Sequence, residues 1–465
     1  MKKPITNDIF YPRTIALIGI SPQTSWWTHN LSNFQGKVYG VNPHPHEDLG
    51  IELYPSLLDI EDEIDHAIVM VSNRIVPQVL EDCGKKGVKV VSIFTSGFSE
   101  IQTDEGRALE AKVKEIAERL GIILVGPNCM GLYNSKIGLN FIGVDLALHE
   151  GKVAFISQSG GLAQNSTVTG RRYGVEILKA VSCGNSALYE PADFLDFFKN
   201  DEEIDLIAMY VEGAKDGRKL LKSLQEANRR KPVIIWKAGK TAEGTRTAGT
   251  HTGVLTGAAN VWEAAMKQSK VVKAEGFLDL IYTAMTFAFD SLKGYNLGIL
   301  SISGGQSVEY TDTLSTTGLE IPVLSAETQR EIESILPEVG VNTRNPLDMA
   351  ASWSQLGMVR KVLKAISKDR NINGIVVSID AHREKIIELI EKDRIKKLTN
   401  AIIEARNSTN TPVFVLLTAT AVEEIALNIF DDFIKAKIPV YRDPAMAANC
   451  IRKLADYWTW RESQN

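Results

Sequence analysis

The sequence predicts an α/β protein of parallel sheets, arranged as successive blocks along the chain. Short apolar runs of strand length alternate with helical patterns almost from end to end, which is typical of parallel α/β domains. A length of 465 residues suits two to four domains. The composition, 44% hydrophobic and 23% charged, is that of an ordinary globular protein with sizeable cores.

The first block predicts five strands, at residues 14–18, 38–41, 67–71, 88–94 and 122–125. Between them lie segments of helix length rich in Ala, Glu, Lys and Leu, such as residues 104–120. Alternation of this kind over about 130 residues, a usual domain size, indicates a Rossmann-like unit.

Two further blocks open in the same way, with a strand that runs into a glycine pair and then a helical stretch. The second opens at residues 151–157 and the third at residues 297–302, after a linker at 289–296. Later strands are expected at 206–211 and 233–236 in the second block, and at 374–379, 413–417 and 439–441 in the third.

Charge and cysteine content exclude several classes of function. The net charge is −5 without a basic stripe, so we expect neither nucleic-acid nor membrane-surface binding. The four cysteines are widely spaced and form no C-x-x-C pair, which argues against disulfides or a zinc site. The N-terminus does not resemble a signal peptide, and no apolar run has the roughly 20 residues that span a bilayer. We expect a cytoplasmic protein.

The two glycine pairs are candidate phosphate sites. They occur in the strings SQSGGLAQNS and SISGGQSVEY, which begin at Ser157 and Ser301. The first amides of a helix and its positive dipole end attract phosphate, and Ser157, Ser159 and Ser303 add hydroxyl donors. The alternative is that a tight strand-to-helix turn needs glycine for packing alone.

The first turn of the chain argues against a dinucleotide. It reads Gly19-Ile-Ser-Pro-Gln, without a G-x-G-x-x-G pattern, and no acidic residue ends the second strand. An NAD-dependent oxidoreductase is therefore a poor interpretation, and another nucleotide-like cofactor remains open.

One of the seven histidines stands out. His44 lies in a Pro-rich turn, and His66, His149 and His382 lie beside charged segments that we expect to be exposed. His251 instead lies in the string TAGTHTGVLTG, where small neighbours allow a bulky group to approach the imidazole. A neutral imidazole is a nucleophile at pH 7. The alternative is an ordinary polar surface residue.

Several segments resemble, in order along the chain, the motifs of ADP-forming acyl-CoA synthetases, relatives of succinyl-CoA synthetase. Residues 249–257 resemble the S-H-T-G-x-L-A-G loop, and residues 210–217 (YVEGAKDG) resemble Y-x-E-G-x-K-D-G. The strings SQSGGL, GPNCMG and NPLD resemble S-Q-S-G-x-L, G-P-N-C-x-G and N-P-x-D.

The resemblance implies a Rossmann-like CoA-binding domain at residues 1–135 and two flavodoxin-like domains at 150–290 and 296–465. The second domain would carry a phosphohistidine. No part of the chain resembles an ATP-grasp domain, so the implied partner is a separate ATP-grasp subunit that binds ADP or ATP with Mg²⁺.

The resemblance also assigns site residues. His251 would carry the phosphoryl group, and Glu212 would orient the imidazole of His251. The alternative for Glu212 is a surface carboxylate at the end of a strand. Phosphate would bind at Ser157, Ser159, Gly160, Gly161, Ser303, Gly304 and Gly305. CoA would bind at Gly19, Ser21, Val41, Pro43, His44, Val71, Ser72, Ser96, Gly97, Asn128 and Cys129. The alternative for Cys129 is a small buried apolar residue.

The chain departs from the family pattern at a few positions. The first turn continues into Trp26 and Trp27, which either belong to the core or cover the pantetheine arm of CoA. The usual N-P-K lysine is His44, and the last glycine of G-G-x-G is Ser307. These changes favour, as a rival, a non-catalytic CoA or nucleotide sensor on the same scaffold. The family motifs do not specify the carboxylic acid, the direction or the subunit stoichiometry.

Overall fold

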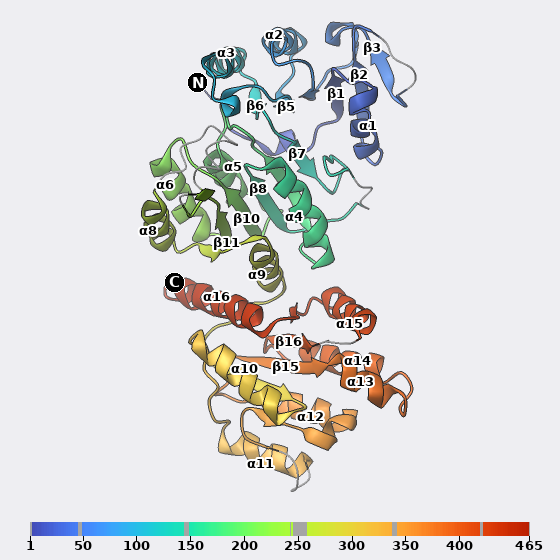
Figure 1. Ribbon diagram of the computed structural model, residues 1–465, viewed down its shortest axis with the longest axis vertical. Coiled ribbons are helices and arrows are strands. Elements are labelled where there is room, and N and C mark those ends of the chain that lie inside the picture. The colour runs from blue at the N-terminus through green and yellow to red at the C-terminus, as the bar shows by residue number, and fades with distance from the viewer. Residues whose placement is uncertain are drawn as a thin grey trace. The chain divides into compact units, whose positions relative to one another are not determined.

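The structure is a computed structural model that describes residues 2–44, 49–143, 148–241, 243–244, 258–336, 342–418 and 422–464. It is an α/β protein with three sheets, which confirms the predicted fold class. The chain forms two compact units, Met1–Ile281 and Tyr282–Asn465. The first unit contains two of the sheets and the second contains the third (Figure 1).

The first sheet has the doubly wound order β3-β2-β1-β4-β5-β6 and is parallel throughout. Its strands are β1 (Thr14–Ile18), β2 (Lys37–Val41), β3 (Glu52–Tyr54), β4 (His66–Val69), β5 (Val90–Ile93) and β6 (Ile123–Val125). Its helices are α1 (Trp26–Asn30), α2 (Val76–Lys86) and α3 (Asp104–Leu120), with short 3₁₀ turns η1 (Asn7–Phe10), η2 (Pro22–Thr24), η3 (Leu57–Asp59) and η4 (Ser99–Ile101). The order reverses between β1 and β4, and ligands of such sheets bind beyond the carboxyl ends of the strands at that point.

Helix α3 shows how local sequence sets the helix bounds. The Thr103 side chain accepts a hydrogen bond from the amide of Gly106 and so caps the first turn. Gly121 ends the helix with φ of +65°, a conformation that favours glycine. The predicted helix at residues 104–120 is therefore confirmed, and in Figure 1 it lies beside α2.

His66 is buried, so the expectation that it is exposed was wrong. It begins β4, which pairs with β1 on one side and β5 on the other, and only 1% of its surface is exposed. Its Nε2 lies 2.8 Å from Ser92 Oγ, and burial lowers its pKa to about 4. The charged neighbours that suggested exposure, such as Asp62 and Glu63, lie in the turn before the strand.

The buried imidazole predicts that the chain loses stability in mild acid. The pKa of His66 in the folded chain lies below its usual 6.5, so the unfolded chain binds the proton first. The contribution of neutral His66 to the free energy of unfolding is present above pH 6.5 and is lost as pH falls towards 4. The free energy of unfolding should therefore fall by about 1 kcal/mol between pH 7.5 and 5.5. Urea unfolding of the wild type and His66→Gln at both pH values measures this loss.

The glutamine variant should lose this part of the pH dependence, whereas replacement of His29, which is exposed on α1, should leave it intact. Equal pH dependence in wild type and His66→Gln would show that His66 is not the titrating group.

The second sheet has the order β12-β11-β10-β8-β9-β7. Its strands are β7 (Gly131–Asn134), β8 (Val153–Ser157), β9 (Ile177–Ser182), β10 (Leu206–Val211), β11 (Val233–Lys237) and β12 (Val272–Ala274), and its helices are α4 (Gly160–Arg172), α5 (Pro191–Phe198), α6 (Gly217–Asn228), α8 (Ala259–Ser269) and α9 (Phe277–Phe289). Strand β7, which lies within the range expected for the first domain, pairs antiparallel with β9. The order reverses between β8 and β10, so the residues after these two strands meet at one point.

The sheet of the second unit has the flavodoxin-like order β14-β13-β15-β16-β17 and is parallel. Its strands are β13 (Leu297–Ser301), β14 (Leu347–Asp348), β15 (Gly374–Asp380), β16 (Val413–Thr418) and β17 (Val440–Tyr441). Its helices are α10 (Gly304–Thr316), α11 (Ala326–Ile335), α12 (Leu356–Ile366), α13 (Ala381–Glu388), α14 (Arg394–Asn407), α15 (Glu423–Lys435) and α16 (Pro444–Glu462), with the 3₁₀ turn η5 (Ala350–Ser354).

Among the described residues, no helix is both long enough and apolar enough to cross a bilayer.

Candidate active site

The turns after β1 and β4 pack directly on each other. Gly19 has φ of +88°, and a Cβ atom there would lie 2.7 Å from Cγ1 of Val71. Glycine is therefore required both for the backbone conformation and for the close approach. This contact brings two of the expected CoA-binding turns together at the point where the strand order reverses.

The turn after β2 docks on the same place. Asn42 donates from Nδ2 to the carbonyl of Ile20 at 2.8 Å, and its Oδ1 accepts the amide of His44 at 2.9 Å. Val41, the last residue of β2, is buried, whereas Pro43 and His44 are exposed. Ser21 caps the short turn η2.

A cleft of about 580 Å³ lies between the carboxyl ends of the first two sheets. It brings together nine of the residues that the sequence singled out, five expected to bind CoA and four from the phosphate and carboxylate sets. They are Val71, Ser72, Ser96, Asn128, Cys129, Ser159, Gly160, Gly161 and Glu212. Gly19, Ser21, Val41, Pro43, His44, Gly97 and Ser157 do not line it, although they follow or end neighbouring strands.

Cys129 lies in the cleft as a buried thiol. It is 4% exposed, and Sγ lies 3.4 Å from the carbonyl oxygens of Ile93 and Val125. Burial raises the pKa of the thiol to about 12, so it stays protonated at neutral pH and is a poor nucleophile. Its neighbour Asn128 has φ of +57°, and its Nδ2 lies 3.4 Å from Oδ1 of Asn185.

The start of α4 opens on the cleft. Ser157 is fully buried and holds the turn: its hydroxyl donates to the carbonyl of Ser159 at 2.7 Å and accepts the Ser159 amide at 3.1 Å. Ser159 Oγ accepts the amide of Leu162, and the helix then begins with Gly160. A Cβ atom at Gly161 would meet nothing within 4 Å, and Gly160 and Gly161 both line the cleft, so the start of the helix, where backbone amides attract anions, faces the cleft.

Glu212 follows β10 and faces the same cleft. Its side chain is mostly buried, with 6% exposed, and the hydroxyl of Tyr210 donates to Oε1 at 3.1 Å. The last residue of β11, Lys237, lies 5.0 Å from the ring centroid of Trp262. Burial lowers the pKa of Lys237 to about 8, although the charge of Glu212 opposes the shift. Among the described residues that line the cleft, Glu212 is the only Asp, Glu, Lys, Arg or His.

His251 lies outside the described residues. Its segment joins two described elements, β11, which ends at Lys237, and α8, which begins at Ala259. Its role as phosphoryl carrier stays a prediction.

The glycine turn of the second unit repeats the construction of the first. Ser301 donates to the carbonyl of Ser303 at 3.1 Å and accepts its amide at 3.4 Å, and α10 begins at Gly304, followed by Gly305. Ser307, where the family pattern has glycine, bonds through its hydroxyl to Ser301 Oγ at 2.6 Å.

The two paired tryptophans differ in burial, and the core alternative is confirmed for Trp27 alone. Trp27 is a core residue with 1% of its surface exposed, whereas Trp26 is 36% exposed. The two rings stack at 5.0 Å, and both contact Phe94, which lines the cleft.

Sequence reasoning did not single out Gln158 and Lys237. Gln158 lines the cleft, and its Oε1 accepts the amides of Glu212 and Gly213. Gln158 follows β8 and Lys237 ends β11, and these two strands lie on either side of β10. The string SQSGG already contains Gln158. A polar residue at the carboxyl end of a predicted strand was therefore the available signal.

Comparison with known proteins agrees with this architecture. A family model described as a CoA binding domain matches residues 13–135, and one described as a succinyl-CoA ligase like flavodoxin domain matches residues 150–287. The chain thus contains a CoA binding domain and a flavodoxin domain of the succinyl-CoA ligase class.

Individual relatives narrow the class. The alpha subunit of acetate–CoA ligase [ADP-forming] II from Pyrococcus furiosus is 35% identical over 94% of this chain and 94% of its own length. The solved structure of the dinucleotide forming acetyl-coenzyme A synthetase 1 from Ca. Korarchaeum cryptofilum, with phosphate and ADP, has a TM-score of 0.86. It is 29% identical, and the match covers 98% of this chain and 97% of that one. The chain belongs to the family of ADP-forming acetate–CoA ligases, and it is similar to the Pyrococcus furiosus alpha subunit over nearly the whole of both chains.

Other relatives are longer. Acetate–CoA ligase [ADP-forming] I from Archaeoglobus fulgidus is 38% identical over 80% of this chain, which covers 54% of that protein. The chain therefore spans about half the length of such relatives.

Proposed function

We propose that the chain is the CoA-binding and phosphohistidine-carrying subunit of an ADP-forming acyl-CoA synthetase. It would interconvert acyl-CoA, ADP and phosphate with a carboxylic acid, CoA and ATP. The observation that carries this proposal is the cleft, which joins the turns expected to bind CoA to a helix start open to phosphate and to the buried carboxylate of Glu212.

The proposed reaction has three steps. A phosphate oxygen attacks the thioester carbonyl, the C–S bond breaks, and acyl phosphate and CoA form. An imidazole nitrogen of His251 then attacks phosphorus and the carboxylate leaves. Finally, an oxygen of the terminal phosphate of ADP takes the phosphoryl group from His251, which gives ATP. The amides at the start of α4 would stabilise the charge on the phosphoryl group, and a swing of the His251 segment would carry it to ADP.

We infer that a separate ATP-grasp subunit binds ADP or ATP with Mg²⁺. Two observations support this inference: the Pyrococcus furiosus relative is named as an alpha subunit, and this chain spans about half of the longer relatives. The second phosphate-binding site would be the turn at Ser303, Gly304 and Gly305. We also infer three domains, at residues 1–135, 150–290 and 296–465; each range holds the strands of one sheet, except that β7 at the end of the first range pairs into the second sheet.

Intact-protein mass tests the proposal. Incubation with the ATP-grasp subunit, Mg²⁺ and ATP should add about 80 Da to this chain as an acid-labile group. The gain should be absent in His251→Ala. If a demonstrably active partner subunit adds no mass, the relay is overturned and a non-catalytic CoA sensor becomes the better interpretation.

A further inference from the structure

Gln158 occupies the point where the strand order of the second sheet reverses. It lies between Ser157, the last residue of β8, and Ser159, the cap of α4, and it is 3% exposed. Its Oε1 accepts the amide of Glu212 at 2.6 Å and the amide of Gly213 at 3.1 Å. One amide side chain thus joins the start of α4 to the segment that carries Glu212.

These two hydrogen bonds determine which way the amide group points. Both partners are backbone donors, so the oxygen must face them and the NH₂ group must face away. Gln158 lines the cleft, and its hydrogen bonds to described residues use its side-chain oxygen and its backbone amide but not its NH₂ group. The amide donor of this mostly buried side chain is therefore oriented in advance towards whatever the cleft binds.

The second unit shows that the turn itself does not need a polar residue at this position. In the matching string SISGG, Ile302 takes the place of Gln158 and is 4% exposed. The two serine hydroxyls make the same pair of hydrogen bonds in both turns. The polar side chain of Gln158 thus has a role beyond building the turn.

The charge of the cleft indicates what that role is. The described residues that line the cleft include no lysine or arginine, and they include the carboxylate of Glu212. A phosphoryl group placed there must be held by neutral donors and kept apart from this carboxylate. The NH₂ group of Gln158, next to the amides of Gly160 and Gly161, is such a donor.

We propose that Gln158 binds an oxygen of the phosphoryl group at the start of α4 and, through its own carbonyl, positions the Glu212–Gly213 segment beside it. This inference rests on the proposed function and identifies the residue that links its phosphate site to Glu212.

Isosteric replacements test the proposal in the complex with the ATP-grasp subunit. Gln158→Glu keeps an oxygen for the two backbone amides but turns the donor into an anion. Gln158→Met removes both functions and resembles the apolar residue of the second unit. Gln225→Glu, on a half-buried position of α6 outside the cleft, is the charge control.

We expect Gln158→Glu to raise the KM for inorganic phosphate about 10-fold or more and to leave the KM for CoA within about twofold. Gln158→Met should raise the KM for phosphate by a smaller factor because it introduces no repulsion, and Gln225→Glu should match the wild type. If Gln158→Glu fails to fold, the KM for phosphate of Gln158→Met tests the proposal in its place.

Two results would overturn the proposal. An unchanged KM for phosphate would show that Gln158 does not bind the phosphoryl group, and equal changes in both KM values would show a purely structural role. In either case the wild-type complex would still be active and His251→Ala would not, so the proposed function would stand. A wild-type complex without activity or phosphorylation would instead overturn both.

Discussion

Replacement of Glu212 by glutamine should slow phosphorylation of His251 by about 1,000-fold without unfolding the chain. The carboxylate is 6% exposed and accepts the hydroxyl of Tyr210, so its position is well defined. In the proposed relay it accepts one imidazole N–H, which leaves the other nitrogen free to attack phosphorus and stabilises the charge that develops on the ring. Glutamine has nearly the same shape but lacks that charge. The rate at which the chain gains about 80 Da measures the effect.

Two further variants make this test specific. Glu226→Gln removes a carboxylate from α6, where Glu226 pairs with Lys199 outside the cleft, and should keep the wild-type rate. Tyr210→Phe removes only the hydroxyl that holds Glu212 and should cost about 10-fold. A wild-type rate in Glu212→Gln would rule out the carboxylate as the group that orients the histidine.

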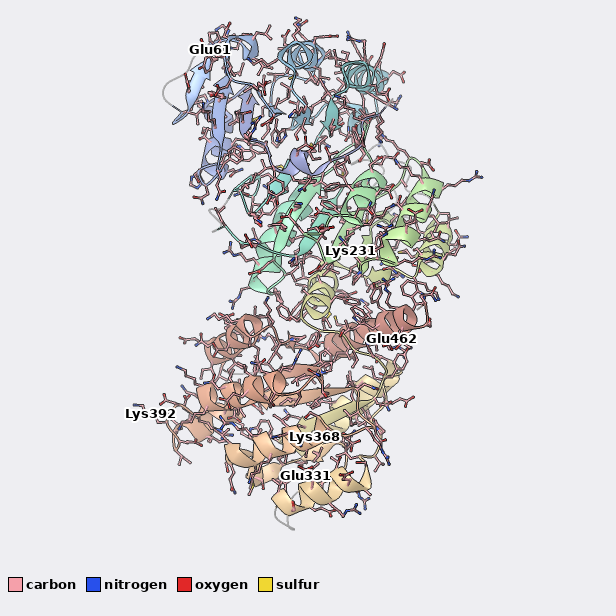
Figure 2. The ribbon with its side chains drawn as sticks, turned by 180° about the vertical axis from the view of Figure 1, so that it is seen from behind. Glu61, Lys231, Glu331, Lys368, Lys392 and Glu462 are labelled. Carbon is pink, nitrogen blue, oxygen red and sulfur yellow. The ribbon has the colours of Figure 1, made fainter. Side chains whose placement is uncertain are left out.

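Arg394→Met should destabilise the second unit by about 3–5 kcal/mol. Arg394 begins α14 and is fully buried, and its Nε donates to Glu384 Oε2 at 3.0 Å. Its other nitrogens donate to the carbonyls of Trp353 and Ser354, while the indole of Trp353 donates to Glu384 Oε1 at 2.6 Å. Removal of the guanidinium leaves a carboxylate with 1% exposure and two carbonyls without their donor. In Figure 2, Lys392, two residues earlier, projects from the surface.

Hydrogen exchange of the amides of β15 and β16 measures this loss in the second unit alone. Burial raises the pKa of Glu384, so the folded chain holds the proton more tightly than the unfolded chain. The charge and hydrogen bond of Arg394 oppose this rise, so without Arg394 the pKa of Glu384 rises further and the loss in Arg394→Met should grow as pH rises.

A surface pair and a double variant serve as controls. Arg360→Met breaks the exposed pair of Arg360 and Glu404, 3.0 Å apart, and should cost about 1 kcal/mol or less. Adding Glu384→Gln to Arg394→Met removes the unpaired charge but keeps an acceptor for Trp353, so part of the stability should return. A loss in Arg394→Met no larger than in Arg360→Met would contradict the prediction.

Local patterns predicted much of the fold. The strands β1, β10 and β13 and the helix α3 begin where their apolar runs and caps indicate. Five strands were missed: β3, β7, β9, β12 and β14. Most are short or lie at or next to a sheet edge, and β7 contains polar and glycine residues that resemble a turn. Its strand conformation depends on pairing with β9, which begins 43 residues later at Ile177.

Long-range packing accounts for the errors at single residues. His66 was expected at the surface because acidic residues precede it, yet the strands on both sides bury it. Gln158 was passed over because its hydrogen bonds to Glu212 and Gly213 join segments more than 50 residues apart. Glycine pairs and serine caps were visible because they act on their own backbone.

The sequence by itself determined the class of fold, the order of the three sheets along the chain and the two Ser-x-Ser-Gly-Gly turns. Strand and helix periodicity and turn chemistry act over a few residues, and a linear sequence displays them directly. Only the tertiary structure decided that the turn after β8 meets the end of β10, that Gln158 joins them, and that Arg394 and Glu384 are buried together. Such contacts depend on which strands lie side by side and on how the helices cover them, and this is settled by the packing of the whole chain.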